Sequence, residues 1–139
     1  MTLLTDERSI VRKIKEAILA IKISRTARRM RSWSTTASGM AAEFVTFAAL
    51  AQAGDHIVAS AQLYGGTVTQ LDVTLRRFGI ETTFVPGTDP ADYRAAVRPG
   101  TKAVYTEVVA NPSGEIADLE GLAAVAHEAG VPLVVDSTM

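Results

Sequence analysis

The sequence contains no cysteine, which excludes disulfide bonds and thiolate metal ligands. Its two histidines, His56 and His127, are too few to suggest a metal cluster, so no metal site is expected. No apolar run approaches the roughly 18 residues of a membrane-spanning helix, and no segment resembles a secretory signal peptide. These absences favour a cytoplasmic protein that does not enter a membrane.

The chain does contain enough apolar material for one core, because hydrophobic residues make up 47 % of its 139 residues. The formal net charge of −1 hides a strong asymmetry. Residues 1–37 carry nine Lys or Arg and three Asp or Glu, a balance of +6, whereas residues 38–139 carry five and twelve, a balance of −7. Such a change predicts a boundary between two segments near residue 37.

Segment 1–37 has the pattern of an amphipathic helix followed by a basic tail. The tail, residues 25–31, has the charge expected of a nucleic-acid or anionic-membrane contact. Trp33 stands alone, however, and base stacking needs several aromatic residues. A solvated basic face or a poorly ordered extension is therefore favoured, and no nucleic-acid partner is expected. Four isoleucines define the helical spacing: Ile10, Ile14, Ile18 and Ile21.

Segment 38–139 alternates helical and strand patterns. Continuous apolar runs separated by helical segments are typical of parallel strands that are buried on both faces. The segment therefore predicts an α/β fold, with a mainly parallel sheet and helices on both faces. The expected helices span 39–53, 65–78, 90–97 and 118–130, and the expected strands span 55–60, 81–85, 103–109 and 131–135.

Two polar residues follow the last two expected strands. Asn111 opens a turn signal, Asn-Pro-Ser-Gly, and Asp136 directly follows an apolar run. In open α/β sheets, ligands bind beyond the carboxyl ends of the strands. We therefore expect Asn111 and Asp136 to face one crevice.

Four motifs in this segment resemble a known family. Asn111-Pro112 and the Val-Asp-Ser-Thr of 135–138 are similar to the large domain of pyridoxal-phosphate (PLP) enzymes with the aspartate-aminotransferase-type (fold type I) architecture. The stretches 38–42 (SGMAA) and 63–67 (LYGGT) resemble its Cys/Met-metabolism, or trans-sulfuration, branch, closest to the O-acetylhomoserine sulfhydrylases. The resemblance covers about residues 38–139, and implies that they form part of the large PLP-binding domain.

The resemblance assigns the PLP phosphate to the start of the first expected helix in this segment. Ser38, Gly39 and Met40 open that helix, where free backbone N–H groups and the helix dipole favour an anion. The family implies phosphate binding by the amides of Gly39 and Met40. The alternative, which the spacing alone favours, is a serine N-cap followed by a small residue that allows close packing.

The resemblance also assigns roles to two groups beside the cofactor ring. It implies that Tyr64 stacks on the pyridine ring and helps to transfer protons, although a loop tyrosine with a satisfied hydroxyl is the simpler alternative. It implies that Asp136 keeps the pyridine nitrogen protonated, so that the ring accepts electrons from the substrate. An aspartate that caps a turn after a strand is the alternative for Asp136.

Two further positions are expected near the cofactor. By resemblance, Asn111 donates to the phenolic oxygen of PLP, and a turn residue before proline is the alternative. Thr138 is expected close to the same site. Glu107 lies in a strand near the site without an assigned role, and His127 is expected to fill surface or core space.

The lysine that forms a Schiff base with PLP has no counterpart among the chain's four lysines: Lys13, Lys15, Lys22 and Lys102. In the family this lysine follows the aspartate motif, so the chain resembles a fragment truncated before it. The family's N-terminal Tyr and Arg, which reach a neighbouring subunit's phosphate, also have no counterpart. We therefore expect the chain alone to be inactive.

The resemblance implies a transferase of methionine and homocysteine synthesis. The complete enzyme would convert O-acetylhomoserine and sulfide or a thiol into homocysteine or a thioether, with release of acetate. It would act on a small amino-acid substrate as a homo-oligomer. A cystathionine γ-synthase or lyase of the same family is the alternative enzyme. A non-catalytic fragment that only associates with other molecules is the alternative from another class.

Overall fold

A computed structural model describes residues 35–138, and its centre is a four-stranded sheet. All strand pairs are parallel, and the order across the sheet is β2-β1-β3-β4. The strands are β1 (His56–Ser60), β2 (Glu81–Val85), β3 (Thr101–Glu107) and β4 (Leu133–Asp136). The prediction of a largely parallel sheet is confirmed.

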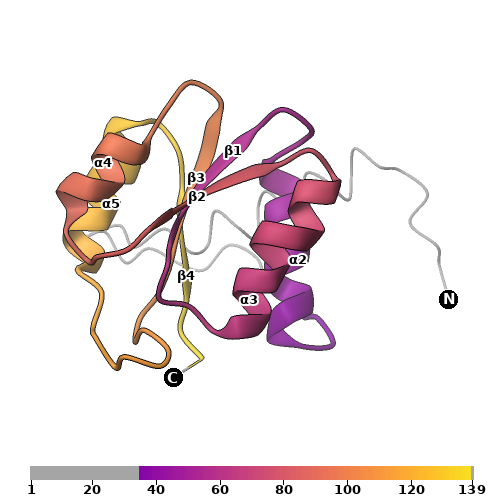
Figure 1. Cartoon of the computed structure of the whole chain (residues 1–139), viewed down its shortest axis with the longest axis horizontal. Helices are drawn as coiled ribbons and strands as arrows, with labels where there is room; N and C mark the ends of the chain where they lie inside the picture. The colour runs from indigo at the N-terminus through magenta and orange to yellow at the C-terminus, as the bar shows by residue number, and fades with distance from the viewer. Residues whose placement is uncertain (1–34, 139) are drawn as a thin grey trace, which may run out of the picture.

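Helices cover both faces of this sheet, as Figure 1 shows. On one face lie α2 (Gly39–Leu50), α3 (Gly65–Thr69) and the π-helix η1 (Gln70–Leu75), which continues directly from α3. On the other face lie α4 (Pro90–Ala96) and α5 (Leu119–Glu128). The predicted three-layer α/β arrangement is therefore also confirmed.

The alternation of side chains along the central strands divides the core into two layers. Ile57 of β1 and Tyr105 of β3 point into the layer under α2 and η1, where Phe47 meets Tyr105 edge to face at 5.1 Å between ring centroids. Val58 and Val104, one position away, point into the layer under α4 and α5. Every residue of β1 is buried, which explains why its three central residues, 57–59, are all apolar rather than alternating with polar ones.

Side-chain caps determine where three of the helices begin. Ser38, Asp89 and Asp118 each accept a hydrogen bond from a backbone N–H of the first turn of α2, α4 and α5. Asp118 was expected inside the last helix but serves as its cap. These caps position the start of each helix, and the start of α2 borders the site described below.

Two expected helices differ from the structure. The helix expected over 39–53 ends at Leu50, because the Asp55 carboxylate accepts the Gln52 amide at 2.9 Å and Gly54 turns the chain with φ +90°. The helix expected over 65–78 changes from α to π geometry at Gln70. Within residues 35–138, no helix is both long and apolar enough to cross a membrane. The amphipathic helix expected in segment 1–37 lies almost wholly outside the described residues.

Candidate functional site

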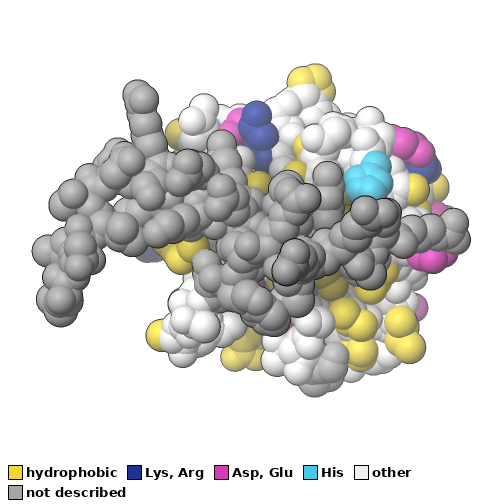
Figure 2. Space-filling model, turned by 180° about the vertical axis from the view of Figure 1, so that it is seen from behind, with side chains coloured by type: hydrophobic (Ala, Val, Ile, Leu, Met, Phe, Trp, Pro, Cys, Tyr) yellow, Lys and Arg dark blue, Asp and Glu magenta, His cyan; other side chains and the backbone are white. Residues whose placement is uncertain are grey.

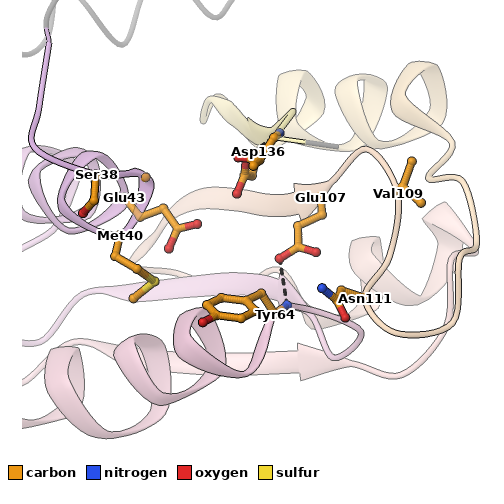
Figure 3. A pocket seen from close by; sticks show the side chains of 10 residues that line it. Ser38, Met40, Glu43, Tyr64, Glu107, Val109, Asn111 and Asp136 are labelled. Atoms are coloured by element: carbon orange, nitrogen blue, oxygen red, sulfur yellow. Dashed lines mark hydrogen bonds between the residues drawn. The ribbon is translucent and has the colours of Figure 1, made fainter.

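A cavity of about 320 Å³ lies at the carboxyl edge of the sheet, where β3 and β4 end and α2 begins (Figure 3). This is the edge at which parallel α/β sheets bind ligands. The seven residues predicted from the sequence all line it, together with Glu43, Glu107 and Val109. The predicted seven are Ser38, Gly39, Met40, Tyr64, Asn111, Asp136 and Thr138.

The start of α2 forms one wall of the cavity. Ser38 Oγ accepts the Ala41 amide at 3.2 Å, and Ser38 O accepts the Ala42 amide at 3.0 Å. The amides of Gly39 and Met40 precede the first intrahelical bond and so have no acceptor within the helix. A Cβ placed on Gly39 would meet nothing within 4 Å, so the space beside these amides is open. This wall therefore suits a small anion.

Tyr64 forms a second wall and is held through its backbone. It is the residue before α3, and its amide donates to Glu107 Oε1 at 2.8 Å. Tyr64 as a whole is 55 % exposed, which makes it one of the exposed large hydrophobic residues of the described chain. A Cβ on Gly66 would lie 2.5 Å from Tyr64 Cε1, so the ring rests directly over a glycine. The absence of a side chain at Gly66 thus gives the ring the room to lie at the cavity.

Asp136 is the last residue of β4, opposite Glu107 of β3 in the sheet register. The sequence had placed it just after the strand. Asp136 Oδ1 accepts both the amide of Thr138, at 2.9 Å, and its hydroxyl, at 2.5 Å. The carboxylate is therefore oriented from the solvent side by the residue two positions later, and its other oxygen remains available to the cavity.

Asn111 reaches the cavity from a folded loop rather than from the end of the strand. Strand β3 ends at Glu107, where its pairing with β4 also ends. The chain then makes a short antiparallel bridge between Val109 and Ile116, and the Ala110 amide donates to Glu115 O at 2.8 Å. Asn111 lies at the tip of this loop, beside the end of the cavity that contains Glu107 (Figure 3).

Glu43 is a residue of the cavity that the sequence analysis missed. It is the one charged residue of α2, and it is only 9 % exposed. The Tyr105 hydroxyl donates to its Oε1 at 2.8 Å, and the Thr67 hydroxyl lies 3.2 and 3.1 Å from its two oxygens. Burial raises the pKa of Glu43, with a further increase from the nearby Asp136 charge, while the two hydroxyl groups lower it. A single acid inside an otherwise apolar helix was the signal that could have identified it.

Carboxyl groups dominate the part of the cavity away from the start of α2. Burial also raises the pKa of Glu107, the Tyr64 N–H opposes that increase, and the Asp136 charge adds to it. Among the described residues that line the cavity there is no Lys, Arg or His. The cavity therefore has backbone donors where α2 begins, and carboxyl groups from the next turn of α2 and from the ends of β3 and β4. An elongated ligand with an anionic end and a cationic end matches this arrangement.

The lysine and histidine positions lie away from this cavity. Lys102, the one lysine among residues 35–138, is in the first part of β3, at the opposite edge of the sheet, with Nζ 3.5 Å from Asp55. His127 is exposed on α5, whereas His56 is buried between the hydroxyls of Thr101 and Thr83. No group of three or more potential metal ligands occurs in the described part of the chain.

Residues 15–139 match the model of the Cys/Met metabolism PLP-dependent enzyme family, so the match begins upstream of the compositional boundary expected near residue 37. The chain is 54 % identical over 106 residues to Sulfhydrylase FUB7 of Fusarium oxysporum, an alignment that covers 76 % of this chain and 24 % of that protein. The chain thus spans about a quarter of the length of this relative.

Solved structures show the same relationship. The O-acetylhomoserine sulfhydrylase of Wolinella succinogenes superimposes with a TM-score of 0.62 and 43 % identity, covering 65 % of this chain and 26 % of that one. Cystathionine γ-lyase of Lactobacillus plantarum gives a TM-score of 0.60 and 38 % identity, covering 63 % and 23 %. The parallel sheet and its helices are those of fold type I PLP enzymes. The chain therefore belongs to the Cys/Met metabolism PLP-dependent enzyme family.

Proposed function

We propose that residues 38–138 form the part of a PLP site that receives the phosphate, the ring face and the ring nitrogen, in a sulfhydrylase acting on O-acetylhomoserine. The observation that carries this proposal is the polarity of the cavity: open amides at Gly39 and Met40, an aromatic face at Tyr64, and the Asp136 carboxylate together line about 320 Å³. These groups fit the phosphate, ring and pyridinium nitrogen of one PLP molecule.

Each residue has a distinct task in this proposal. The amides of Gly39 and Met40 bind the phosphate, assisted by the dipole of α2. Tyr64 packs against the ring and can exchange a proton through its hydroxyl. Asp136, oriented by Thr138, accepts a hydrogen bond from the protonated ring nitrogen and so keeps it protonated, and Asn111 donates to the phenolic oxygen. When bound, PLP supplies an electron-accepting ring for charge that develops at the substrate's α-carbon.

The substrate and reaction follow from the relatives. Sulfhydrylase FUB7 and the Wolinella enzyme carry sulfhydrylase activity in their names, and both are more than 40 % identical to this chain. The proposed reaction joins O-acetylhomoserine and sulfide or a thiol, with loss of acetate. The likeness to cystathionine γ-lyase supports the alternative, cleavage or synthesis of cystathionine. The two reactions are distinguished by assays on a longer protein that contains this domain together with a Schiff-base lysine. Release of acetate from O-acetylhomoserine supports the sulfhydrylase, and cleavage of cystathionine supports the alternative.

Binding of pyridoxamine 5′-phosphate to the 139-residue chain tests the cofactor site directly, because this ligand needs no lysine. Calorimetry should show binding, and Asp136→Ala should weaken it about tenfold or more, since a charge-assisted hydrogen bond contributes roughly 1.5–3 kcal/mol. Asp72→Ala is the matched control, because Asp72 is exposed on η1 and its ion-pair partner among residues 35–138 is Arg76, at 3.7 Å. Equal binding by the wild type and Asp136→Ala would refute the proposal.

Covalent attachment is a separate question. Lys102 lies at the edge of the sheet away from the cavity, so the described residues offer no partner for the PLP aldehyde. The chain incubated with PLP and borohydride should show scattered, substoichiometric pyridoxyl labelling by mass spectrometry, and no turnover of O-acetylhomoserine. Stoichiometric labelling of one lysine would contradict this expectation.

A further inference from the structure

Glu43 and Asp136 are two carboxyl groups that line the same cavity, and they are close enough for the Asp136 carboxylate to raise the pKa of Glu43. Glu43 extends from α2 and Asp136 from the end of β4, and Figure 3 shows both groups turned into the same space. Two carboxylates at this range cannot both be ionised without a cation between them. The described residues lining the cavity include no basic side chain to offset two negative charges, which favours a pair that retains one proton.

Hydrogen bonds indicate which member holds the proton. Glu43 Oε1 accepts the Tyr105 hydroxyl at 2.8 Å, and burial raises the pKa of Tyr105, so this hydroxyl remains a donor. The Thr67 hydroxyl lies 3.2 Å from Oε1 and 3.1 Å from Oε2, and its one proton can be donated to Oε1, which leaves Oε2 to carry a proton toward Asp136. Asp136 Oδ1 accepts two donors from Thr138, an arrangement that suits a carboxylate. Glu43 is also the more deeply buried of the two, at 9 % exposure.

We propose that Glu43 and Asp136 share one proton, which resides on Glu43, and that Glu43 thereby positions the ionised Asp136 carboxylate. This inference rests on the proposed function, because an ionised Asp136 is what a protonated ring nitrogen requires. The Glu43 O–H donates to Asp136 from the α2 side, and Thr138 donates from the opposite side. The carboxylate is held between these two donors and keeps one lone pair directed at the cavity.

Groups on three elements act on Glu43, and they act in different directions. Its burial and the charge of Asp136, from β4, raise the Glu43 pKa, whereas the hydroxyls of Tyr105, from β3, and Thr67, from α3, lower it. Glu107 of β3 is the remaining acid that lines the cavity. Replacing Asp136 and replacing Tyr105 should therefore move the Glu43 titration in opposite directions.

Carbon-13 NMR of the full chain, labelled at glutamate carboxyl groups, measures this titration without a cofactor. The Glu43 signal is identified by its loss in Glu43→Gln. In the wild type it should titrate above the ordinary value of glutamate; Asp136→Asn should lower that pKa, and Tyr105→Phe should raise it further. A Glu43 signal that titrates at the ordinary value in the wild type, or that does not move in folded Asp136→Asn, would overturn the proposal.

Pyridoxamine 5′-phosphate labelled with nitrogen-15 in its ring tests the consequence for binding. Glu43→Gln should bind within about threefold of the wild type with a protonated ring nitrogen, because its amide still donates to Asp136. Glu43→Met cannot donate, so its affinity should fall about tenfold. Thr67→Val removes the hydroxyl that bonds Glu43 but keeps both Glu43 and Asp136. If Thr67→Val weakens binding as much as Glu43→Met, Glu43 only anchors α2 and the positioning role is wrong.

The two measurements separate the two hypotheses. If the wild-type chain does not bind pyridoxamine 5′-phosphate, the proposed function is wrong for this chain, while the carbon-13 titration still tests the carboxyl pair. If the ligand binds but Asp136→Asn leaves the Glu43 titration unchanged, the pair is wrong and the proposed function stands.

Discussion

Gly66 shapes the site through the absence of a side chain. A Cβ at this position would lie 2.5 Å from Tyr64 Cε1 and 3.2 Å from Met40 Sδ, both closer than ordinary packing allows. The neighbouring Gly65 has nothing within 4 Å of the same ideal Cβ. Two adjacent glycines therefore have different tasks, and only Gly66 is needed for the close approach of the tyrosine ring.

Gly66→Ala should displace the Tyr64 ring and weaken binding of pyridoxamine 5′-phosphate. Overpacking of this kind costs roughly 1–3 kcal/mol, which corresponds to a loss in affinity of about five- to a hundredfold where the strain falls on the binding geometry. Gly65→Ala is the matched control and should change affinity by less than about twofold. Calorimetry of both variants checks the difference. Equal affinities for the two alanine variants would show that the ring does not need its present position.

The raised pKa of Glu43 makes a prediction about stability. An acid whose pKa is raised by folding binds a proton more tightly in the folded chain, so its contribution to the free energy of unfolding falls as pH rises above 4.5 and through the raised value. Glu43→Gln removes this loss. Its melting temperature should therefore exceed that of the wild type by an amount that grows from pH 4.5 up to the raised pKa of Glu43 and is constant above it.

Thermal unfolding followed by circular dichroism over this pH range measures that difference. Glu128→Gln is the control, because Arg94 holds the pKa of Glu128 below its usual value and both side chains are exposed. Its removal should not reproduce the growing advantage. A Glu43→Gln melting temperature that runs parallel to the wild type at every pH would contradict the assignment.

The sequence indicated which residues line the cavity better than it indicated their hydrogen-bond partners. Asn111 and Asp136 were recognisable because polar residues follow buried strands, and Gly39 because it opens a helix. Glu43 was not recognised, since its role depends on Tyr105, 62 positions away in the chain. Glu107 was noticed without a role for the same reason: its partner is the backbone amide of Tyr64, 43 positions away.

At the scale of whole elements, Gln70 joins the π-helix η1 to the start of α2. Its side chain is buried, with the amide nitrogen 3.1 Å from Met40 O and the amide oxygen 3.0 Å from Phe44 N. One side chain therefore bonds a donor and an acceptor of the α2 backbone, next to the wall that borders the cavity. The π geometry begins at this residue, and π segments are frequent at functional sites.

Gln70→Leu should destabilise the chain by roughly 1–3 kcal/mol, because it removes both hydrogen bonds of a buried amide while nearly conserving volume. The same variant should weaken binding of pyridoxamine 5′-phosphate, since α2 loses its attachment beside Met40. Urea unfolding and calorimetry measure the two effects. Gln52→Leu, at an exposed position in the turn after α2, is the matched control and should change neither. A Gln70→Leu chain as stable as the wild type would refute the coupling.

Element types were predictable from the sequence, whereas their order and local geometry were not. The strand expected over 81–85 has the bounds of β2, and all four strands are parallel as expected. The change from α3 to η1 at Gln70 was not predicted, because apolar periodicity does not register one buried polar side chain. The strand order β2-β1-β3-β4 could not be predicted from the hydrophobic pattern either, because the strands have similar apolar sequences.

For the molecule as a whole, the two edges of the described sheet differ in character. Edge strand β2 begins with Glu81, Thr82 and Thr83, whereas edge strand β4 consists of Leu133, Val134 and Val135 before Asp136. Apolar side chains also reach the surface in several separate places on the back face of the molecule (Figure 2). Unpaired strand edges without a charge promote association with other strands. The β4 edge is therefore the expected point of self-association of the isolated chain.

The purified 139-residue chain should elute from gel filtration as concentration-dependent oligomers or aggregates, and Val135→Lys should shift it toward monomer. The lysine places a charge on β4, the edge strand of the described sheet, which opposes strand addition by a second copy. Val73→Lys is the matched control, because Val73 is 42 % exposed on η1, away from the edge, and should not change the elution. In the wild type, hydrogen exchange of the β4 amides should slow as concentration rises, a readout that needs no variant. A wild-type chain that is monomeric at all concentrations and melts cooperatively would show that the β4 edge is already protected, and the prediction would be wrong.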